Sequence, residues 1–326
     1  MAHHIRVLSE EDVRSALSMD QAIIVMAKAF AQLSHGLLSM PVRMVSHFDQ
    51  TMLFYKPAAS KNEHIIGVKL LTQVGSNRGQ SLPVIQGLIL LTDYHNGRFL
   101  ALMDGTYITS LRTGAASGLA TKWLSREDAK VAAIFGAGVQ GRTQLMAICK
   151  VRCIEKAYIF DILAEATGAF IDQMQPVCNA KLISGSSLEV LKEVDIICTA
   201  TDASKPLFDM SHLKKGVHIN AIGSFRPCMT EIHEEVIAQA QVYVDHKESA
   251  LAESGDLINP VQSGVVSESH IVGEIGALIN GEIPGRTDEG GVTVFKSVGV
   301  AVQDLATAYA VYQNAITHNL GQMIHL

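Results

Sequence analysis

One stretch of the sequence decides the fold: Val131-Ala-Ala-Ile-Phe-Gly136-Ala-Gly138-Val139-Gln140-Gly141-Arg-Thr-Gln-Leu-Met-Ala-Ile148. A short apolar run predicts a buried strand, three glycines follow at the G-x-G-x-x-G spacing, and a helical pattern begins at once. A second strand-like run ends in Asp161, about 20 residues after the last glycine. This order of strand, glycine turn, helix and acid is typical of a dinucleotide-binding βαβ unit.

The glycine loop has a physical role at each position. Gly136 permits the tight turn, Gly138 lets the backbone approach a pyrophosphate, and Gly141 lets the helix pack close to its strand. The start of the helix, at Val139 and Gln140, offers unpaired N–H groups and the positive end of the helix dipole to the phosphates. We therefore take these five residues as candidate cofactor-binding residues.

Asp161 indicates which dinucleotide the unit binds. An acid at the end of the second strand would accept hydrogen bonds from the ribose hydroxyls of the adenosine half. NADP binding instead favours a cation that meets the 2′-phosphate, and the residues after Asp161 are Ile162, Leu163 and Ala164. We expect NAD(H) as the preferred cofactor, with NADP(H) as the open alternative.

Composition limits the other classes of function. The 326 residues, 48% of them hydrophobic, are enough for two domains. A net charge of −6 without a cluster of basic residues argues against nucleic acid as a partner. The five cysteines lack metal or C-x-x-C spacing, which favours reduced thiols in a cytoplasmic protein, and no histidine pair has a zinc-site pattern. We expect no metal, no signal peptide and no membrane helix.

A region of domain size precedes the nucleotide-binding pattern. Ser18-Met-Asp-Gln21 is a capping box that predicts the start of a helix, which continues to Gly36. Strand-like segments follow at 42–48, 52–55, 65–74, 84–92 and 98–103, and then a helix at 109–123. Asn96-Gly97 is typical of a hairpin turn before the last of these strands. These elements predict a mostly antiparallel sheet with one helical layer.

From residue 131 onward strands and helices alternate, which predicts a parallel sheet. The strand candidates are 131–135, 157–160, 181–183, 194–199, 217–222 and 241–245, with helices at 270–281 and 300–317 and an extended segment at 292–298. We expect the last helix to return to the first domain and complete it. The predicted fold class is therefore α/β, a Rossmann-type doubly wound nucleotide domain (125–299) inserted into an α+β substrate-binding and dimerisation domain (1–124, completed by 300–326).

Three cations of the first domain suggest a substrate site. Arg43 begins a strand, and Arg112 lies early in a helix built of small residues. Lys69 lies in the apolar run Ile65–Leu71, which we expect to be buried on both faces, so that the lysine needs a partner or a ligand. The alternative is an ordinary solvent-facing lysine. Two arginines and a lysine that converge would suit a carboxylate.

The sequence resembles the ornithine cyclodeaminase / mu-crystallin family over essentially its whole length. The resemblance rests on motifs in the same order and spacing: Met40-Pro-Val-Arg43, Gly67-Val-Lys69, Leu82-Pro83, Leu111-Arg-Thr-Gly-Ala-Ala-Ser117, Gly136–Gly141, Thr199-Ala-Thr201, Asn220-Ala-Ile-Gly223 and Thr293-Val-Phe-Lys-Ser-Val-Gly299.

The resemblance implies a homodimer whose N-terminal sheets pair across a twofold axis, with a nicotinamide cofactor between the domains of each subunit. It implies that Arg43, Lys69 and Arg112 surround the carboxylate and the reacting nitrogen of a small imino or amino acid. It further implies that the cofactor meets the glycine loop, Arg112, Thr113, Thr201 and Ile222.

Two departures separate this sequence from the ornithine cyclodeaminases of the family. Those enzymes carry an aspartate shortly after the Asn-Ala-(Val/Ile)-Gly motif, where this sequence has Phe225. They also carry a glutamate in an N-terminal strand, whereas Met52–Pro57 contains no acid. Both features that would recognise the cationic tail of ornithine are missing, so ornithine cyclodeamination is an alternative and not the main expectation.

The main expectation is NAD(P)H-dependent reduction of a small cyclic imino acid, Δ1-pyrroline-2-carboxylate or Δ1-piperideine-2-carboxylate, to L-proline or L-pipecolate. Gly-Ser-Phe-Arg-Pro at 223–227 resembles the ketimine-reductase branch of the family. Arg43 and Arg112 would hold the carboxylate, and Lys69, with a lowered pKa, would supply or order a proton. An alanine-type amino-acid dehydrogenase is a further alternative, and a non-enzymatic ligand carrier is the least favoured.

Acidic and basic residues near the end of the chain receive no catalytic role. We expect Asp304 and Lys296 to be helix-surface or packing residues, and the acids of Glu253-Ser-Gly-Asp256 to cap a helix rather than to meet the substrate.

Overall fold

The computed structural model describes residues 4–77, 80 and 82–325, and the chain divides into two compact units. The first unit contains the chain up to Arg112 and from Val300 onward, and the second contains Thr113–Gly299. The first boundary lies inside helix α3 (Gly105–Leu124), whereas the sequence predicts it at residues 124/125.

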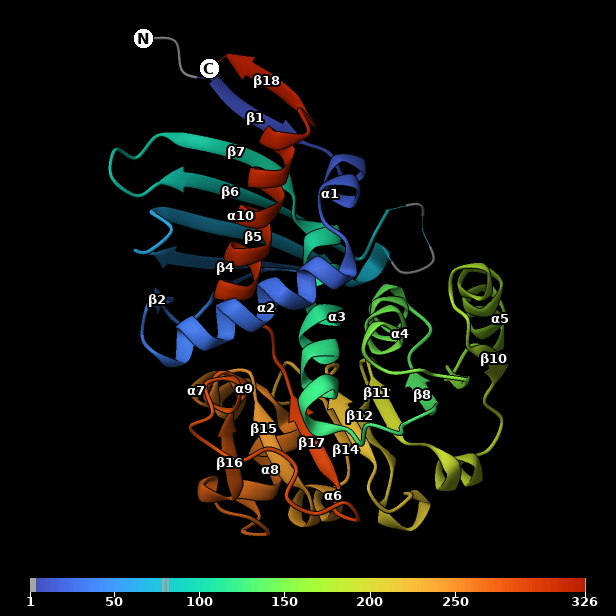
Figure 1. Ribbon diagram of the computed structural model, residues 1–326. Coiled ribbons are helices and arrows are strands. Elements are labelled where there is room, and N and C mark those ends of the chain that lie inside the picture. Colours follow the sequence, from blue (N-terminus) through green and yellow to red (C-terminus); the bar gives the residue numbers. More distant parts are fainter. Residues whose placement is uncertain (1–3, 78–79, 81, 326) are drawn as a thin grey trace. The chain divides into compact units, whose positions relative to one another are not determined.

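The first unit is an eight-stranded sheet with helices on one face (Figure 1). Its strands are β1 (His4–Leu8), β2 (Leu38–Ser39), β3 (Met44–Phe48), β4 (Thr51–Ser60), β5 (Ile65–Val74), β6 (Ile85–Asp93), β7 (Phe99–Asp104) and β18 (Gln322–His325), and its helices are α1 (Glu10–Ala16), α2 (Met19–Ser34) and α10 (Ala301–Thr317). The strand order is β18-β1-β7-β6-β5-β4-β2, with β3 paired to β4. All neighbours are antiparallel except β1 and β7.

The C-terminal helix α10 completes this unit, as predicted. It packs against α2 and against β4, β5 and β6. Gly67 permits the close approach, because a Cβ atom there would lie 2.7 Å from Leu305 Cδ1. The predicted capping box is also confirmed, since the Ser18 side chain accepts from the backbone N–H of Gln21 at the start of α2.

Only one face of β5 is buried, so the prediction of a strand buried on both faces is wrong for the single chain. Every second residue from Ile65 to Leu71, Lys69 included, is buried under α10. On the other face Ile66 and Leu70 are 37% and 42% exposed. The apolar alternation that suggested two buried faces therefore reflects one buried face and one open apolar face.

The second unit is an α/β domain built on a parallel sheet. Its main strands are β8 (Val131–Phe135), β9 (Lys156–Phe160), β10 (Lys181–Ser184), β11 (Ile196–Thr199), β13 (His218–Ala221), β15 (Gln241–Val244), β16 (Ile271–Glu274) and β17 (Thr293–Lys296), and β12 (Ser204–Phe208) pairs with β14 (Thr230–Ile232). The helices are α4 (Val139–Val151), α5 (Ala164–Met174), α6 (Glu234–Gln239), α7 (Lys247–Glu253), α8 (Gly255–Gln262) and α9 (Ile275–Ile279). The predicted helix at 270–281 is wrong in its first part, where β16 joins the sheet.

Both faces of this sheet are buried, which confirms the doubly wound class. Along β8, Ala132 and Ile134 pack into one apolar cluster with α4 and α5 residues, whereas Ala133 and Phe135 pack into a second cluster with α6 and α8 residues. The strand order is β10-β9-β8-β11-β13-β17-β15-β16. Successive strands are added outward in one direction from β8 through β9 to β10 and in the other direction from β11 onward, so the strand order reverses between β8 and β11. Open parallel sheets bind ligands at this point, beyond the carboxyl ends of their strands.

Candidate active site

The glycine loop has the geometry that its pattern predicts. Gly136 has φ +101°, and a Cβ atom there would lie 2.5 Å from the Ala200 carbonyl oxygen. A Cβ atom at Gly141 would lie 2.0 Å from the carbonyl oxygen of Gly136, so α4 can pack this close to the turn only with glycine. Gly138, in contrast, has open space where a Cβ atom would stand. Gly136 and Gly141 are therefore needed by the protein itself, and Gly138 leaves room for a ligand.

The amino end of α4 fits an anionic group. Gly138 is its N-cap and offers no side-chain cap, so the first N–H groups of the helix have no side-chain acceptor there. Val139 is 57% exposed. Two buried polar atoms nearby, Gln140 Oε1 and Arg142 Nε, have no hydrogen-bond partner among the described residues. The N–H groups at the start of α4 and the Arg142 Nε–H are donors suited to the phosphates of a dinucleotide, whereas Gln140 Oε1 can only accept.

Asp161, the candidate for the ribose hydroxyls, anchors the glycine loop. One carboxylate oxygen accepts from the N–H of Ala137 at 2.8 Å, and the other accepts from the N–H of Leu163 at 3.0 Å. Each carboxylate oxygen has a second lone pair, so ribose hydroxyls can still bind. The residue after the acid is Ile162, which is 95% exposed, and not a cation.

The other candidate cofactor residues lie in helix α3 and at the carboxyl ends of the sheet strands. Thr113 is buried in α3, where neighbouring Gly114 lets the helix approach α4: a Cβ atom there would lie 2.5 Å from the Thr143 carbonyl oxygen. Thr201 follows β11, and Ile222, which is 8% exposed, follows β13.

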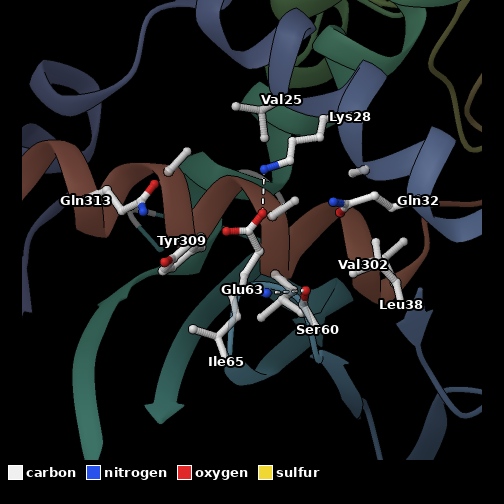
Figure 2. A pocket seen from close by; sticks show the side chains of 14 residues that line it. Val25, Lys28, Gln32, Leu38, Ser60, Glu63, Ile65, Val302, Tyr309 and Gln313 are labelled. Atoms are coloured by element: carbon white, nitrogen blue, oxygen red, sulfur yellow. Dashed lines mark hydrogen bonds and ion pairs between the residues drawn. The ribbon is translucent and has the colours of Figure 1, made fainter. Parts of the chain in front are cut away.

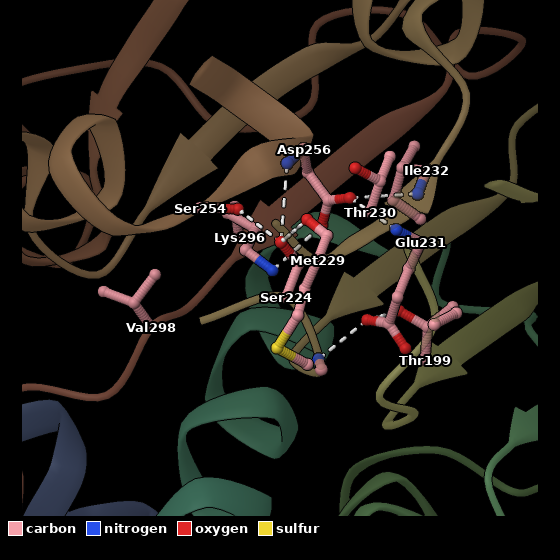
Figure 3. Close-up of polar contacts among 12 residues, drawn as sticks. Thr199, Ser224, Met229, Thr230, Glu231, Ile232, Ser254, Asp256, Lys296 and Val298 are labelled. Atoms are coloured by element: carbon pink, nitrogen blue, oxygen red, sulfur yellow. Dashed lines mark hydrogen bonds and ion pairs between the residues drawn. The ribbon is translucent and has the colours of Figure 1, made fainter. Parts of the chain in front are cut away.

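A buried carboxylate joins these two strand ends (Figure 3). Glu231, at the centre of β14, accepts hydrogen bonds from Thr201 and from the N–H of Gly223, all at 2.7 Å. Asp256 Oδ1 accepts a hydrogen bond from the backbone N–H of Glu231 at 2.7 Å, and Asp256 Oδ2 forms an ion pair with Lys296 Nζ at 3.0 Å. Burial and the nearby Asp256 raise the pKa of Glu231, and Lys296 and the Thr201 donors oppose that rise. Lys296 is therefore a fully buried ion-pair residue of this network.

In the first unit, Lys69 and Arg112 converge on one carboxylate. Lys69 Nζ donates to Asp304 Oδ1 at 2.7 Å and to Thr109 Oγ1 at 3.0 Å. Arg112 Nε donates to the same Asp304 oxygen at 3.0 Å. Asp304 is 2% exposed, so the expectation that it is a helix-surface or plain packing residue is wrong. Its second oxygen, Oδ2, is buried without a hydrogen-bond partner among the described residues.

Arg43 and Lys56 complete the cluster. The Arg43 guanidinium lies 5.5 Å from the centre of the Phe54 ring, and its charge acts on both lysines. Lys56 is 6% exposed and lies directly opposite Lys69 in the β4–β5 pairing. Lys56, Lys69 and Arg112 therefore act on the one carboxylate of Asp304, and Arg43 adds a fourth positive charge beside the lysines, which leaves an excess of positive charge for an anionic ligand.

Lys56 and Asp304 were not predicted as site residues, although the position of each in its strand or helix indicates that it is buried. Lys56 alternates with Phe54 and Ala58, which are both buried in β4, so it lies in phase with the core face. Asp304 lies four residues before Ala308 on the apolar face of α10. A charged residue in phase with an apolar face needs a buried partner, and here each has one in the same cluster.

Burial and the neighbouring charges shift the pKa values of this cluster. Burial lowers the pKa of Lys69 to about 8, with Arg112 acting in the same direction and Asp304 opposing. Burial and the adjacent Lys69 ammonium lower the pKa of Lys56 well below its usual value. For Asp304, burial alone would raise the pKa, but Lys69 and Arg112 lower it to about 2. The predicted lowering of the Lys69 pKa agrees with this environment.

A cavity of about 110 Å³ lies elsewhere in the first unit (Figure 2). It is lined mainly by α2 and α10, and Lys28 and Glu63 form an ion pair across it. None of the four clustered cations lines it. Within the described ranges, no set of three or more His, Cys, Asp or Glu residues could hold a metal, and no helix is long and apolar enough to cross a membrane.

The doubly wound sheet with its glycine loop defines the class of a Rossmann-type dinucleotide-binding protein. Residues 4–319 match the Ornithine cyclodeaminase/mu-crystallin family, and the chain belongs to this family.

Individual relatives are similar over nearly the full length. The chain is 38% identical over 322 residues to a Δ1-pyrroline-2-carboxylate reductase of Bacillus cereus, covering 98% of this chain and 99% of that protein. The structure of Thermococcus litoralis Δ1-pyrroline-2-carboxylate reductase in complex with NADH and L-proline has a TM-score of 0.94 and 37% identity, covering 98% of this chain and 100% of that one. An archaeal alanine dehydrogenase dimer with bound NAD has a TM-score of 0.93 and 32% identity, covering 98% and 99%.

Proposed function

We propose that this protein is an NAD(H)-dependent reductase of a small cyclic imino acid, forming L-proline from Δ1-pyrroline-2-carboxylate or L-pipecolate from Δ1-piperideine-2-carboxylate. The proposal rests on the buried cations Lys56, Lys69 and Arg112 around the single carboxylate of Asp304, with the partly buried Arg43 beside the two lysines. The reductase relatives at 37–38% identity support the same chemistry.

The residues of the cluster supply binding and a proton. Arg43 and Arg112 hold the carboxylate of the imino acid, because guanidinium groups bind carboxylates at two points. Lys69 uses two of its three N–H groups on Asp304 and Thr109, so the third remains for the substrate. Lys69 thereby donates or orders the proton that makes the imine nitrogen cationic. Asp304 Oδ2 is left to accept from the N–H that results. Bound NADH would supply the hydride to the imine carbon.

Ornithine cyclodeamination is disfavoured by the charges of the first unit. The far ammonium of ornithine would need a carboxylate, and the one carboxylate of the cluster already binds Lys69 and Arg112. An alanine-type dehydrogenase remains the second candidate, because the archaeal alanine dehydrogenase is similar over almost the whole chain. Ammonia release from L-ornithine, and NADH oxidation with pyruvate and ammonium, would reveal these two activities. Turnover of the cyclic imine faster than either would support the proposal.

The kcat/KM for reduction of the cyclic imine should fall above pH 8. The pKa of Lys69 is lowered to about 8, so the proton-donating ammonium dominates below this pH and is lost above it. We expect kcat/KM for the imine to fall about tenfold per pH unit above that point. NADH binding, followed by fluorescence over the same range, is the control and should change little. A constant kcat/KM up to pH 10 would contradict the role of Lys69.

NADH should be preferred over NADPH. A 2′-phosphate would lie beside the Asp161 carboxylate with no cation after it, and like charges in contact are strongly unfavourable. We expect kcat/KM with NADH to exceed that with NADPH by at least about 10-fold. The double substitution Asp161→Ser with Ile162→Arg should reverse the order. Equal use of both cofactors by the unsubstituted protein would contradict this assignment.

We propose further that the protein is a homodimer joined through the open face of the first sheet. Leu70 and Leu88 lie opposite each other in the β5–β6 pairing and are 42% and 51% exposed, next to exposed Ile66. Contiguous exposed apolar surface of this kind marks an interaction site. A second copy is the occupant we favour, because an archaeal relative is described as a dimer.

Charges on this face should separate the two copies. In sedimentation velocity we expect the unsubstituted protein at twice its chain mass of 35.1 kDa, and Leu70→Glu with Leu88→Glu at the chain mass. Leu163→Glu, at an exposed leucine of the second unit, is the matched control. A double variant with the mass of the unsubstituted protein would overturn the assignment of this face.

A further inference from the structure

We propose that Glu231 is a positioning residue that clamps the nicotinamide half of the cofactor site through the strand ends of β11 and β13. This inference rests on the proposed binding of NAD(H). It concerns a residue that would touch neither substrate nor cofactor, because its carboxylate is fully buried behind the backbone of the two loops. The carboxylate holds both loops at once through Thr201 and Gly223. Figure 3 shows Glu231 beside Thr199 and Asp256.

Both oxygens of Glu231 are fully engaged. Oε1 accepts from the N–H and the hydroxyl of Thr201, each at 2.7 Å. Oε2 accepts from the N–H of Gly223 and the hydroxyl of Thr199, also at 2.7 Å. Each oxygen faces one backbone N–H, that of Thr201 or that of Gly223, and an N–H can only donate. A carboxylate accepts from both N–H groups, whereas an amide offers a single oxygen and turns its NH2 group toward the other N–H.

Asp256 and Lys296 fix the position of Glu231. Asp256 Oδ1 accepts from the backbone N–H groups of Glu231 and Ile232, and its other oxygen pairs with Lys296. Gly223 leaves no room for movement, since a Cβ atom there would lie 2.2 Å from the Thr201 carbonyl oxygen and 2.4 Å from Glu231 Oε1. The clamp therefore has one tightly packed arrangement.

The strand order assigns this clamp to one half of the dinucleotide. Asp161, at the end of β9, marks the adenosine half on one side of β8. β11 and β13 lie on the other side of β8, so the remaining half of the cofactor extends over the loops that contain Thr201 and Gly223. Asp161 accepts hydrogen bonds from Ala137 and Leu163, on the other side of β8 from the loops that Glu231 holds, so the adenosine half should depend much less on Glu231.

The test compares two ligands that share the adenosine half. Titrations of the unsubstituted protein and of Glu231→Gln with NADH, and with ADP-ribose, which lacks the nicotinamide, give the dissociation constants. We expect Glu231→Gln to raise the dissociation constant for NADH about 10-fold and to leave that for ADP-ribose within about twofold. The reason is that the amide removes a hydrogen-bond acceptor only from the loops that contain Thr201 and Gly223. The exposed Glu235→Gln is the matched control and should change neither.

Thr199→Val, which removes one hydrogen bond to Glu231 and keeps the strand, provides a second variant if Glu231→Gln does not fold. It should show the same selective loss for NADH, at about threefold. Equal losses for both ligands, or no loss for NADH, would overturn the clamp. Failure of the unsubstituted protein to bind NADH at all would instead refute the proposed function, so the two failures are distinguishable.

Discussion

Lys69→Met should lower kcat for the cyclic imine by about 10²- to 10⁴-fold, the range that a general acid contributes. Methionine keeps the length and apolar body of the side chain but offers no proton and no hydrogen bond to the substrate. NADH binding should stay within about twofold, because Lys69 lies in the first unit and the glycine loop in the second. Turnover that survives Lys69→Met would contradict the mechanism.

Loss of stability must be separated from loss of chemistry in this variant. Lys69 and Asp304 form a fully buried ion pair, and removal of one partner of such a pair costs about 3–5 kcal/mol. Thermal unfolding should therefore occur at a lower temperature, and the rates are to be measured well below it. Lys69→Arg keeps a cation beside Asp304 and should recover stability more fully than turnover. Lys130→Met, at an exposed lysine, controls for the substitution itself.

Gly138→Ala should weaken NADH binding without weakening the protein. A Cβ atom at Gly138 would meet no protein atom within 4 Å, and φ −83° suits alanine. The methyl group would instead occupy the space through which the backbone approaches the pyrophosphate. Such overpacking costs about 1–3 kcal/mol, which corresponds to about 5- to 150-fold in Kd.

Gly168→Ala is the matched control for this substitution. Gly168 lies in α5 of the same unit, and a Cβ atom there also meets nothing within 4 Å. It should leave the Kd for NADH unchanged. Gly141→Ala should behave differently from both, because its Cβ atom would meet the Gly136 carbonyl oxygen and the variant should unfold more easily. Unchanged NADH affinity in Gly138→Ala would contradict the placement of the pyrophosphate.

The cofactor-binding unit could be predicted because its signal is local. Gly136, Gly138 and Gly141 lie within six residues, and one local unit explains all three, through the tight turn, the approach of the backbone to the pyrophosphate and the close packing of the helix. The strand before them and Asp161 after them complete a pattern that needs no knowledge of distant contacts. The predicted hairpin at Asn96-Gly97 belongs to the same class, since Gly97 adopts φ +71° between β6 and β7.

The substrate cluster could be predicted only in part because it depends on distant contacts. Asp304 meets Lys69 across 235 positions of sequence, and only the packing of α10 on β5 brings them together. Glu231 was missed for the same reason, since its donors come from two other strand ends. The short strands β1 and β18, which pair the two ends of the chain, carry no periodic signal long enough to be detected.

The most direct measurement is the decrease in absorbance of NADH with purified protein and Δ1-pyrroline-2-carboxylate, beside an otherwise identical reaction with Lys69→Met. We expect rapid oxidation of NADH and one equivalent of L-proline per NADH consumed, and almost no NADH oxidation or L-proline formation with the variant. Ammonia and L-proline formed from L-ornithine without net consumption of cofactor, while the cyclic imine leaves NADH unchanged, would contradict the proposed function.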